Sequence, residues 1–131
     1  MDARSHAVRT KDINRAMSNI APDVVSFDVV YSLQYRGFEA SRKRTQEWFS
    51  SFQGSIGYEV RDLGITMGDT VAFCHSLNHI SGLKTDGGKI AMWVRVTLCC
   101  QKLNDIWMIT HEHNSVPFDP ESGKAGLNLQ P

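Results

Sequence analysis

The chain has no long apolar run and no excess of charge of either sign. No stretch approaches the roughly 18 to 20 apolar residues of a membrane span. Residues 1–10 mix charges with small side chains instead of forming the apolar core of a signal sequence. Fourteen basic residues balance 14 acidic ones, although nucleic acids and anionic membranes attract proteins with a basic excess. We therefore expect no nucleic-acid partner, no membrane partner and a cytoplasmic location.

Cysteine is scarce, which excludes a disulfide framework. The three cysteines are Cys74, Cys99 and Cys100, an odd number in which two are chain neighbours. Neighbouring residues of a strand point to opposite faces, so we expect reduced, buried thiols. The 131 residues, 41% of them hydrophobic, are enough for a core without such help. We expect one domain over residues 1–131.

The first half of the chain carries helical and strand patterns in alternation. Ile13, Ala16, Met17 and Ile20 form one apolar stripe behind the N-cap residue Asp12, and the helix should stop at Ala21-Pro22. The expected elements are a short helical piece over Asp2–Thr10, a helix over Ile13–Ile20, a strand over Val24–Tyr31 and an amphipathic helix over Phe38–Phe52.

The second half reads as strands joined by tight turns. Turn residues recur near Gly68, Gly87 and Asn104, and each turn separates two strand-like runs. The runs are Tyr58–Thr66, Thr70–Leu83, Lys89–Lys102 and Ile106–Val116, followed by an irregular tail over Pro117–Pro131. Such long strands must twist into a curled antiparallel meander. We predict an α+β fold in which this curved sheet wraps around the N-terminal helices and leaves a cone with an internal pocket.

Two groups of side chains receive structural roles. We assign the aromatic residues at helix or strand spacing to core packing, namely Trp48, Phe49, Phe52, Trp107 and Phe118. The basic run Arg42-Lys43-Arg44 lacks a Gly-rich phosphate cradle, so we interpret it as a solvated helix face.

Two motifs within this order of elements point to a family. Tyr35-Arg36-Gly37 precedes a helix, and Trp107-Met108-Ile109-Thr110-His111-Glu112-His113-Asn114-Ser115 forms the last strand. Over Ile13–Phe118 the chain resembles the SnoaL-like, ketosteroid-isomerase-like families of the nuclear-transport-factor-like superfamily. The resemblance implies an α+β cone that is usually dimeric. Its pocket hosts isomerases, dehydratases, cyclases, hydrolases and many non-enzymes, mostly without metal, and we expect no cofactor.

Asp28 is the leading candidate for chemistry. Phe27, Val29 and Val30 flank it in the sequence, and an apolar surrounding suits a carboxylate that abstracts protons. The resemblance places the proton-shuttling aspartate of ketosteroid isomerases at this position. The alternative is a structural aspartate that is solvated or hydrogen-bonded to a neighbouring strand.

The acid donors of such isomerases have no counterpart here. The resemblance puts Arg4 and Thr97 at the positions of the family's tyrosine and aspartic acid, which leaves steroid isomerisation unsupported. Candidate ligand-binding substitutes are Tyr31, Tyr35, Trp93 and Arg95, and we expect Trp93, Arg95 and Thr97 to share the pocket face. A surface salt bridge is the alternative role for Arg95.

Four histidines fall in two same-face pairs, His75 with His79 and His111 with His113. His-x-His in a strand is a weak metal pattern, so we expect no metal. His113 is the candidate partner of Asp28 in proton transfer, with His75 and His111 beside the ligand; the alternative is that they bridge strands. Asn78 is either a ligand-binding amide of the pocket or an ordinary surface amide.

Two functions remain open from these residues. The first is a homodimer that binds a small hydrophobic organic molecule, with isomerase, cyclase or dehydratase chemistry by acid and base at Asp28. The second is a non-enzymatic dimerisation or scaffold module with a vestigial pocket. In both, we expect the apolar positions Val94, Val96 and Leu98 to form a sheet face that a second subunit covers.

Overall fold

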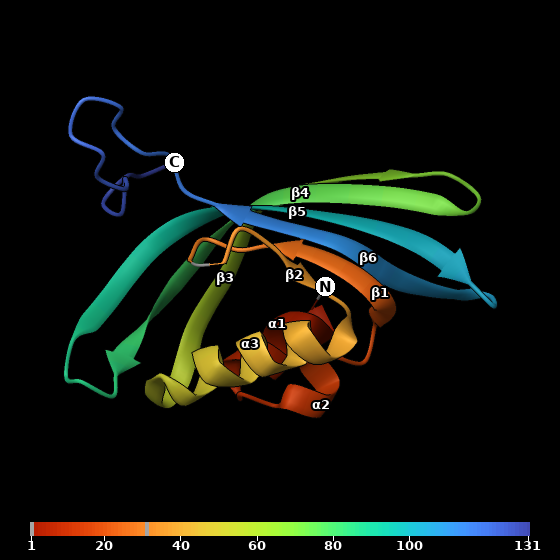
Figure 1. Ribbon diagram of the computed structural model, residues 1–131, viewed down its shortest axis with the longest axis horizontal. Helices are drawn as coiled ribbons and strands as arrows, with labels where there is room; N and C mark the ends of the chain where they lie inside the picture. The colour runs from red at the N-terminus through yellow and green to blue at the C-terminus, as the bar shows by residue number, and fades with distance from the viewer. Residues whose placement is uncertain (1, 31) are drawn as a thin grey trace.

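The computed structural model describes residues 2–30 and 32–131. In it, six strands form one curved sheet whose concave side faces three helices (Figure 1). The elements are α1 (Asp2–Arg9), α2 (Ile13–Ala16), β1 (Ile20–Phe27), β2 (Tyr35–Arg36), α3 (Phe38–Ser50), β3 (Phe52–Met67), β4 (Val71–Lys84), β5 (Lys89–Leu103) and β6 (Ile106–Ser115). Within these described residues, no helix has the length and apolarity needed to cross a membrane. The predicted α+β class, with a curved sheet around N-terminal helices, is confirmed.

The strand order is β2-β1-β6-β5-β4-β3. Strands β3 to β6 pair with their sequence neighbours, so the predicted antiparallel meander is confirmed. Strand β1 adds to its edge in parallel with β6, with Ser26 beside Glu112 and Phe27 beside His113. A parallel pair needs a long connection, and here α3 and the whole meander lie between the two strands. The sheet is therefore mixed, although its larger part is antiparallel.

The predicted helix over Ile13–Ile20 is too long. Asp12 is its N-cap as predicted, because its carboxylate accepts the Arg15 N–H at 3.2 Å. The helix ends at Ala16, however, and Ile20 already opens β1. Its amide donates to the Met17 carbonyl at 3.2 Å, which closes a turn and redirects the chain. Ile20 is thus buried as a strand residue, and the apolar stripe is shared between two elements.

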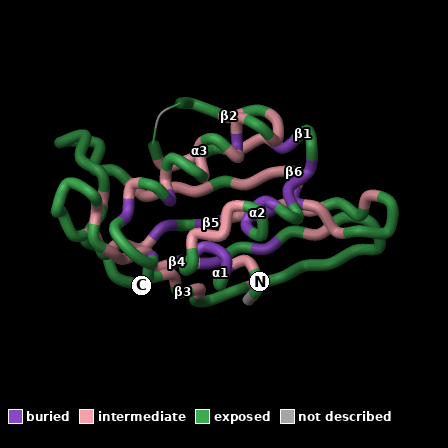
Figure 2. The backbone as a smooth tube through the Cα atoms, turned by 90° about the horizontal axis from the view of Figure 1, so that it is seen from below, coloured by how far each residue is buried: buried purple, intermediate pink, exposed green. Residues whose placement is uncertain are grey.

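The core lies between the helices and the concave side of the sheet. Figure 2 shows buried stretches on the helices and central strands, with the hairpin ends and the C-terminal tail exposed. Phe49 and Phe52 belong to this core and Trp48 packs against it, as predicted. Trp107 is only half-buried. Phe118 is 66% exposed, so its core assignment is wrong: the tail leaves the end of β6 and runs away from the body (Figure 1).

The two faces of the sheet are reversed relative to our expectation. The inner face of β5, which packs on the helices, carries Val94, Val96 and Leu98, all 6% exposed or less. These residues are therefore unavailable to a second subunit, and that expectation is wrong. Alternate positions point away from the helices and form the outer face, defined by Phe73, His75, Leu77, Trp93, Arg95, Thr97, His111 and His113. Helices cover whichever face is more apolar, which the prediction overlooked.

Gly37 sets the start of α3. It is the N-cap residue, with φ 90°, a conformation that favours glycine. Its N–H donates to the Val24 carbonyl at 2.7 Å, which ties the helix start to β1. The Tyr35-Arg36-Gly37 motif thereby fixes how α3 crosses beneath the end of β1.

Candidate functional site

A cavity of about 280 Å³ lies between the inner face of the sheet and the helices. Most of its wall is apolar, with Met17, Ile20, Ile80, Val94 and Val96 among the lining residues. Its polar lining residues are Arg4, Ser26, Asp28, Tyr35, Ser41, Arg44, Thr45, Tyr58, Lys84, Glu112 and Asn114. An apolar chamber with a few polar groups is the usual form of a small-molecule site.

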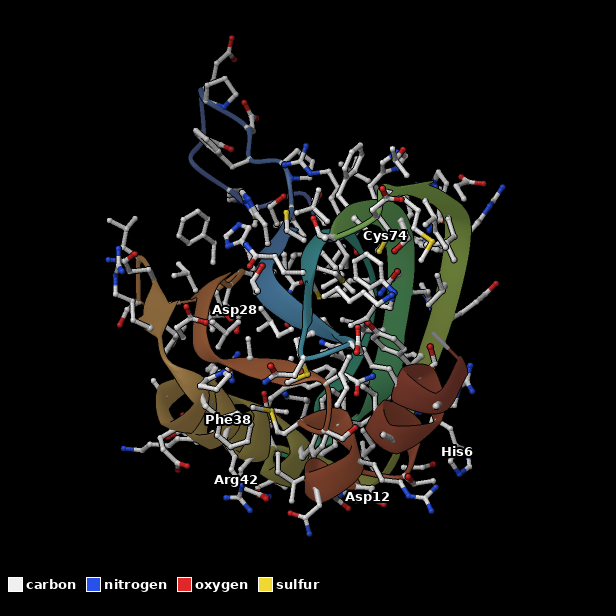
Figure 3. All side chains as sticks on the ribbon, turned by 90° about the vertical axis from the view of Figure 1, so that its right-hand side faces the viewer. His6, Asp12, Asp28, Phe38, Arg42 and Cys74 are labelled. Carbon is white, nitrogen blue, oxygen red and sulfur yellow. The ribbon has the colours of Figure 1, made fainter. Side chains whose placement is uncertain are left out.

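Asp28 lines this cavity directly after the end of β1. One carboxylate oxygen accepts the Val29 N–H at 2.6 Å, and the other lies 2.9 Å from Nε of Arg44 on α3. The side chains are 22% and 19% exposed, so the ion pair is largely shielded from water. Figure 3 shows Asp28 between β1 and α3, whereas Arg42 lies on the far side of the helix. One oxygen of Asp28 is thus hydrogen-bonded by the backbone, and the other is ion-paired with Arg44, whose buried Nε has no hydrogen-bond partner among the described residues.

Arg44 was missed by the sequence analysis, which placed it on a solvated face. Four lining residues of α3 follow the spacing i, i+3, i+4 and i+7, namely Ser41, Arg44, Thr45 and Trp48. This spacing puts all four on one side of the helix. The helical period was the signal that could have separated Arg44 from its basic neighbours Arg42 and Lys43.

A second ion pair lies on β6. Arg4 of α1 donates to Glu112 at 3.0 Å, and the other Glu112 oxygen accepts from the Asn114 amide at 3.1 Å. Burial disfavours the charge on Arg4, but Glu112 and, less strongly, Tyr58 together outweigh this cost, so the pKa of Arg4 is raised. Glu112 was also missed, although its place between His111 and His113 already put it on the opposite face from them.

The phenol of Tyr58 belongs to a buried hydrogen-bond chain. Its oxygen accepts from the Asn78 amide at 2.5 Å, and the Asn78 carbonyl oxygen accepts from Ser76 at 2.7 Å. Burial raises the pKa of Tyr58, and the nearby Arg4 guanidinium opposes this only in part. The phenol is therefore a neutral hydroxyl, and no acceptor for its proton lies within residues 2–30 and 32–131.

The carboxylates of Asp28 and Glu112 belong to neighbouring positions in the register of β1 and β6. Ser26 of β1 pairs with Glu112 of β6, and Asp28 follows Ser26 by two residues on the same face. The Ser26 hydroxyl is buried and has no hydrogen-bond partner among residues 2–30 and 32–131. The strand pair β1 and β6 thus lines one wall of the cavity with acidic and hydroxyl groups.

Lys84 lies at the end of β4, where the cavity meets the start of β3. Its ammonium donates to the Ser51 hydroxyl at 2.7 Å and lies 4.3 Å from the ring centroid of Phe52. Burial lowers the pKa of Lys84, and Arg44 lowers it further while Asp86 raises it. Lys84 was not among the residues expected at the site.

The structure brings together only part of the predicted site. Asp28 and Tyr35 line the cavity, and Asn78 lies behind Tyr58, to which it is bonded. Tyr31 lies outside the described residues. Arg4, which the resemblance placed at the position of an acid donor, lines the cavity and is ion-paired with Glu112.

The remaining predicted ligand residues point away from the cavity. His75, Trp93, Arg95, Thr97, His111 and His113 lie on the outer face. The expected partnership of Asp28 with His113 is therefore wrong. His113 is paired in register with Phe27, whose ring it contacts at 5.4 Å, and the next residue, Asp28, points to the opposite side.

The outer histidines have structural neighbours. His111 Nδ1 bonds the Val25 carbonyl at 2.7 Å, and the His79 ring lies 4.9 Å from Trp93. Among the described residues, no group of three or more His, Cys, Asp or Glu side chains is arranged to hold a metal ion. The three cysteines are free, and burial raises the pKa of the Cys74 and Cys100 thiols.

Comparison with known proteins agrees with this architecture. Residues 1–119 match the SnoaL-like domain family. No curated protein matches the chain. An NTF2-like protein of unknown function from Pseudomonas putida KT2440 is similar over 99% of this chain and 90% of its own, with 28% identity and a TM-score of 0.91. A ketosteroid isomerase-like protein from Erwinia carotovora atroseptica covers 87% of this chain and 88% of its own, with 15% identity and a TM-score of 0.73.

Proposed function

Because the chain belongs to the SnoaL-like domain family, we propose that its cavity binds a small, predominantly apolar organic molecule. The observation that carries this proposal is the shielded pair of Asp28 and Arg44 in the wall of an otherwise apolar chamber. Enclosing charged side chains in the wall of an apolar chamber costs free energy that apolar packing alone could avoid. A ligand with an apolar body and a polar end uses both features.

A cavity-filling variant tests this function. Met92 lines the cavity, and Met92→Trp fills part of its volume. The control is Arg95→Trp, which adds the same ring to the exposed outer face of the same strand. Thermal-shift screening of small organic compounds, followed by calorimetry, should find ligands for the wild type and the control but not for Met92→Trp. Equal binding by all three proteins would show that binding occurs outside the cavity.

A second candidate function is acid–base catalysis of the isomerase, cyclase or dehydratase type. It is supported by a carboxylate and a neutral phenol that line the same chamber, Asp28 and Tyr58. A carboxylate can remove a proton next to a carbonyl group while a phenol hydrogen-bonds the oxygen that gains charge. Proton exchange at such carbons of a bound ketone, followed by NMR in deuterated water, should then be lost in Asp28→Asn. An exchange rate that is unchanged in Asp28→Asn would contradict catalysis by Asp28 and leave ligand binding as the remaining function.

We also propose a cytoplasmic homodimer in which residues 1–131 act as one domain. A dimer through the outer face is supported by the apolar side chains Val71 and Phe73 of β4, which are 57% and 47% exposed. The three free cysteines support a reducing compartment such as the cytoplasm. The continuous sheet supports a single domain. A dimerisation or scaffold module would use this same outer face without needing the cavity. Ligand binding that is lost in Met92→Trp, without any change in assembly, would favour the binding function over the module.

A further inference from the structure

The charges in the cavity wall do not balance. The charged lining residues are Arg4, Arg44 and Lys84 against Asp28 and Glu112. Each carboxylate already has its own guanidinium, at 2.9 Å for Asp28 with Arg44 and at 3.0 Å for Glu112 with Arg4. One positive charge is therefore left over in the described lining, and it belongs to Lys84.

The ammonium of Lys84 contacts neutral groups, and Asp86 attracts it only from beyond ion-pair distance. In the part of the chain that the structure describes, no carboxylate lies within ion-pair distance of its ammonium, which instead bonds the Ser51 hydroxyl and lies over the Phe52 ring. A partly desolvated ammonium gains more from an anionic acceptor than from a hydroxyl, because charge-assisted hydrogen bonds are roughly twice as strong. Burial lowers the pKa of Lys84 by more than the attraction of Asp86 raises it, which agrees with this incomplete compensation.

The part of the cavity around Arg4 has no surplus positive charge. There Arg4, Glu112 and Asn114 satisfy one another, and the Tyr58 phenol offers a neutral donor. A ligand cation would meet net positive charge in the chamber, whereas a ligand with one negative charge would neutralise it. From Lys84 towards the strand position opposite Tyr58, the wall formed by β4 and β5 is apolar, with Ile80, Ile90 and Met92 lining it.

We propose that the ligand is an organic monocarboxylate whose carboxylate pairs with Lys84 and whose apolar body lies against Ile80, Ile90 and Met92. This inference rests on the proposed binding function and specifies its ligand class. The single surplus charge favours a carboxylate over a phosphate ester, which carries up to two negative charges. A neutral oxygen at the far end of the ligand would accept the proton of Tyr58.

The test compares acids with their uncharged counterparts by isothermal titration calorimetry at neutral pH. The probes are naphthaleneacetate and decanoate, each beside its primary amide, which keeps shape and apolar area but removes the charge. The proteins are the wild type, Lys84→Met, Lys84→Arg and the control Lys89→Met, an exposed lysine across the same hairpin. Thermal melting establishes that each variant is folded.

We expect the wild type, Lys84→Arg and Lys89→Met to bind at least one acid about tenfold or more tightly than its amide. Lys84→Met should lose this preference while its affinity for the amide stays the same. Equal affinity for acid and amide in the wild type, or a preference that survives in Lys84→Met, overturns the carboxylate inference and leaves the binding function intact. No binding of any of the four probes counts against both.

Discussion

Asp28 and Arg44 connect the end of β1 to the middle of α3 across the cavity wall, with 2.9 Å between Oδ2 and Nε. The backbone amide of Val29 holds the other oxygen of Asp28 at 2.6 Å. Both partners of the pair are therefore positioned before any ligand arrives. The same arrangement makes Asp28 a part of the structure as well as a candidate for chemistry.

The Asp28 and Arg44 pair should show measurable coupling in a double-mutant cycle. Asp28→Asn leaves a shielded guanidinium without its counter-charge, and we expect each single variant to lose about 1 to 3 kcal/mol of unfolding free energy. Asp28→Asn combined with Arg44→Gln should cost less than the sum. Urea denaturation measures the stability of each of the four proteins in the cycle. The control is the exposed pair of Asp12 and Arg15, 3.6 Å apart, for which we expect a coupling energy of about 0.5 kcal/mol or less. Coupling no larger than in this control would contradict the structural role.

Tyr58 should make stability depend on alkaline pH. Its folded pKa is raised by burial above the ordinary value of 10.0, so the folded protein keeps the phenol proton where the unfolded chain releases it. This contribution is present below pH 10 and is lost as the pH rises towards the folded pKa. Tyr58→Phe should cost about 1 to 2 kcal/mol at pH 7, because the buried Asn78 amide loses its acceptor.

The two proteins should then converge in stability above about pH 10, because only the wild type carries this titration. Urea melts at a series of pH values measure the difference. Tyr35→Phe is the control, since its hydroxyl accepts from an exposed Ser32 amide. A constant difference between wild type and Tyr58→Phe at every pH would speak against a buried phenol.

The orientation of β5 can be tested with two adjacent residues. Leu98 is 3% exposed on the inner face, so Leu98→Ala should cost about 2 to 4 kcal/mol. Thr97 lies on the outer face, and Thr97→Ala should change stability by less than about 0.5 kcal/mol. Chemical denaturation of both variants checks this. The reverse order would mean that the strand presents its other face to the helices.

The proposed homodimer can be tested by the mass of the protein in solution. Light scattering at micromolar concentration should give twice the 14.7 kDa of the chain. Phe73→Lys introduces a charge on the outer face and should shift the protein towards the monomer, because a buried unpaired charge disfavours association. Leu33→Lys, at a position 93% exposed in the turn before β2, should remain dimeric. A wild-type protein that sediments as a monomer would remove the dimer proposal.

We expect the protein to need no metal. His111 is engaged with the Val25 carbonyl, and its ring lies 6.4 Å from that of His113 in an edge-on arrangement. Dialysis against a chelator should leave the melting temperature and ligand binding unchanged, because no coordination bond contributes to folding. Elemental analysis of the purified protein provides the check. Stoichiometric zinc or iron that disappears in the His111→Ala/His113→Ala double variant would contradict this expectation.

The strands and the curvature could be predicted because they follow from local chemistry. Turns around Gly68, Gly87 and Asn104 separate long β-prone runs, and such runs can pair only with their neighbours in a meander. The parallel pairing of β1 with β6 could not be predicted in this way. It joins Ser26 to Glu112 across most of the chain, and no local pattern specifies so distant a partner.

The site was predicted less well because alternation alone does not say which face is inner. We gave the pocket to the polar set Trp93, Arg95 and Thr97, whereas the helices cover the apolar set that includes Val94 and Val96. That choice also misplaced His113. Asp28 lines the cavity wall, but its partner Arg44 belongs to a basic run in which Lys43 is exposed and Arg42 lies on the far side of the helix (Figure 3).

The pairing of β1 with β6 also has a consequence for folding, because we expect it to form last. Strands β3 to β6 can form from nearby segments, whereas β1 must close a loop of more than 80 residues to reach His111 from Val25, and such distant contacts form slowly. The meander can therefore exist as an open sheet before the chamber does. Amide hydrogens of β1 would then gain protection from exchange after those of β4 and β5. A ligand of the chamber would have nothing to bind until this last strand docks, so it would act on the rate of unfolding and leave the early steps of folding unchanged.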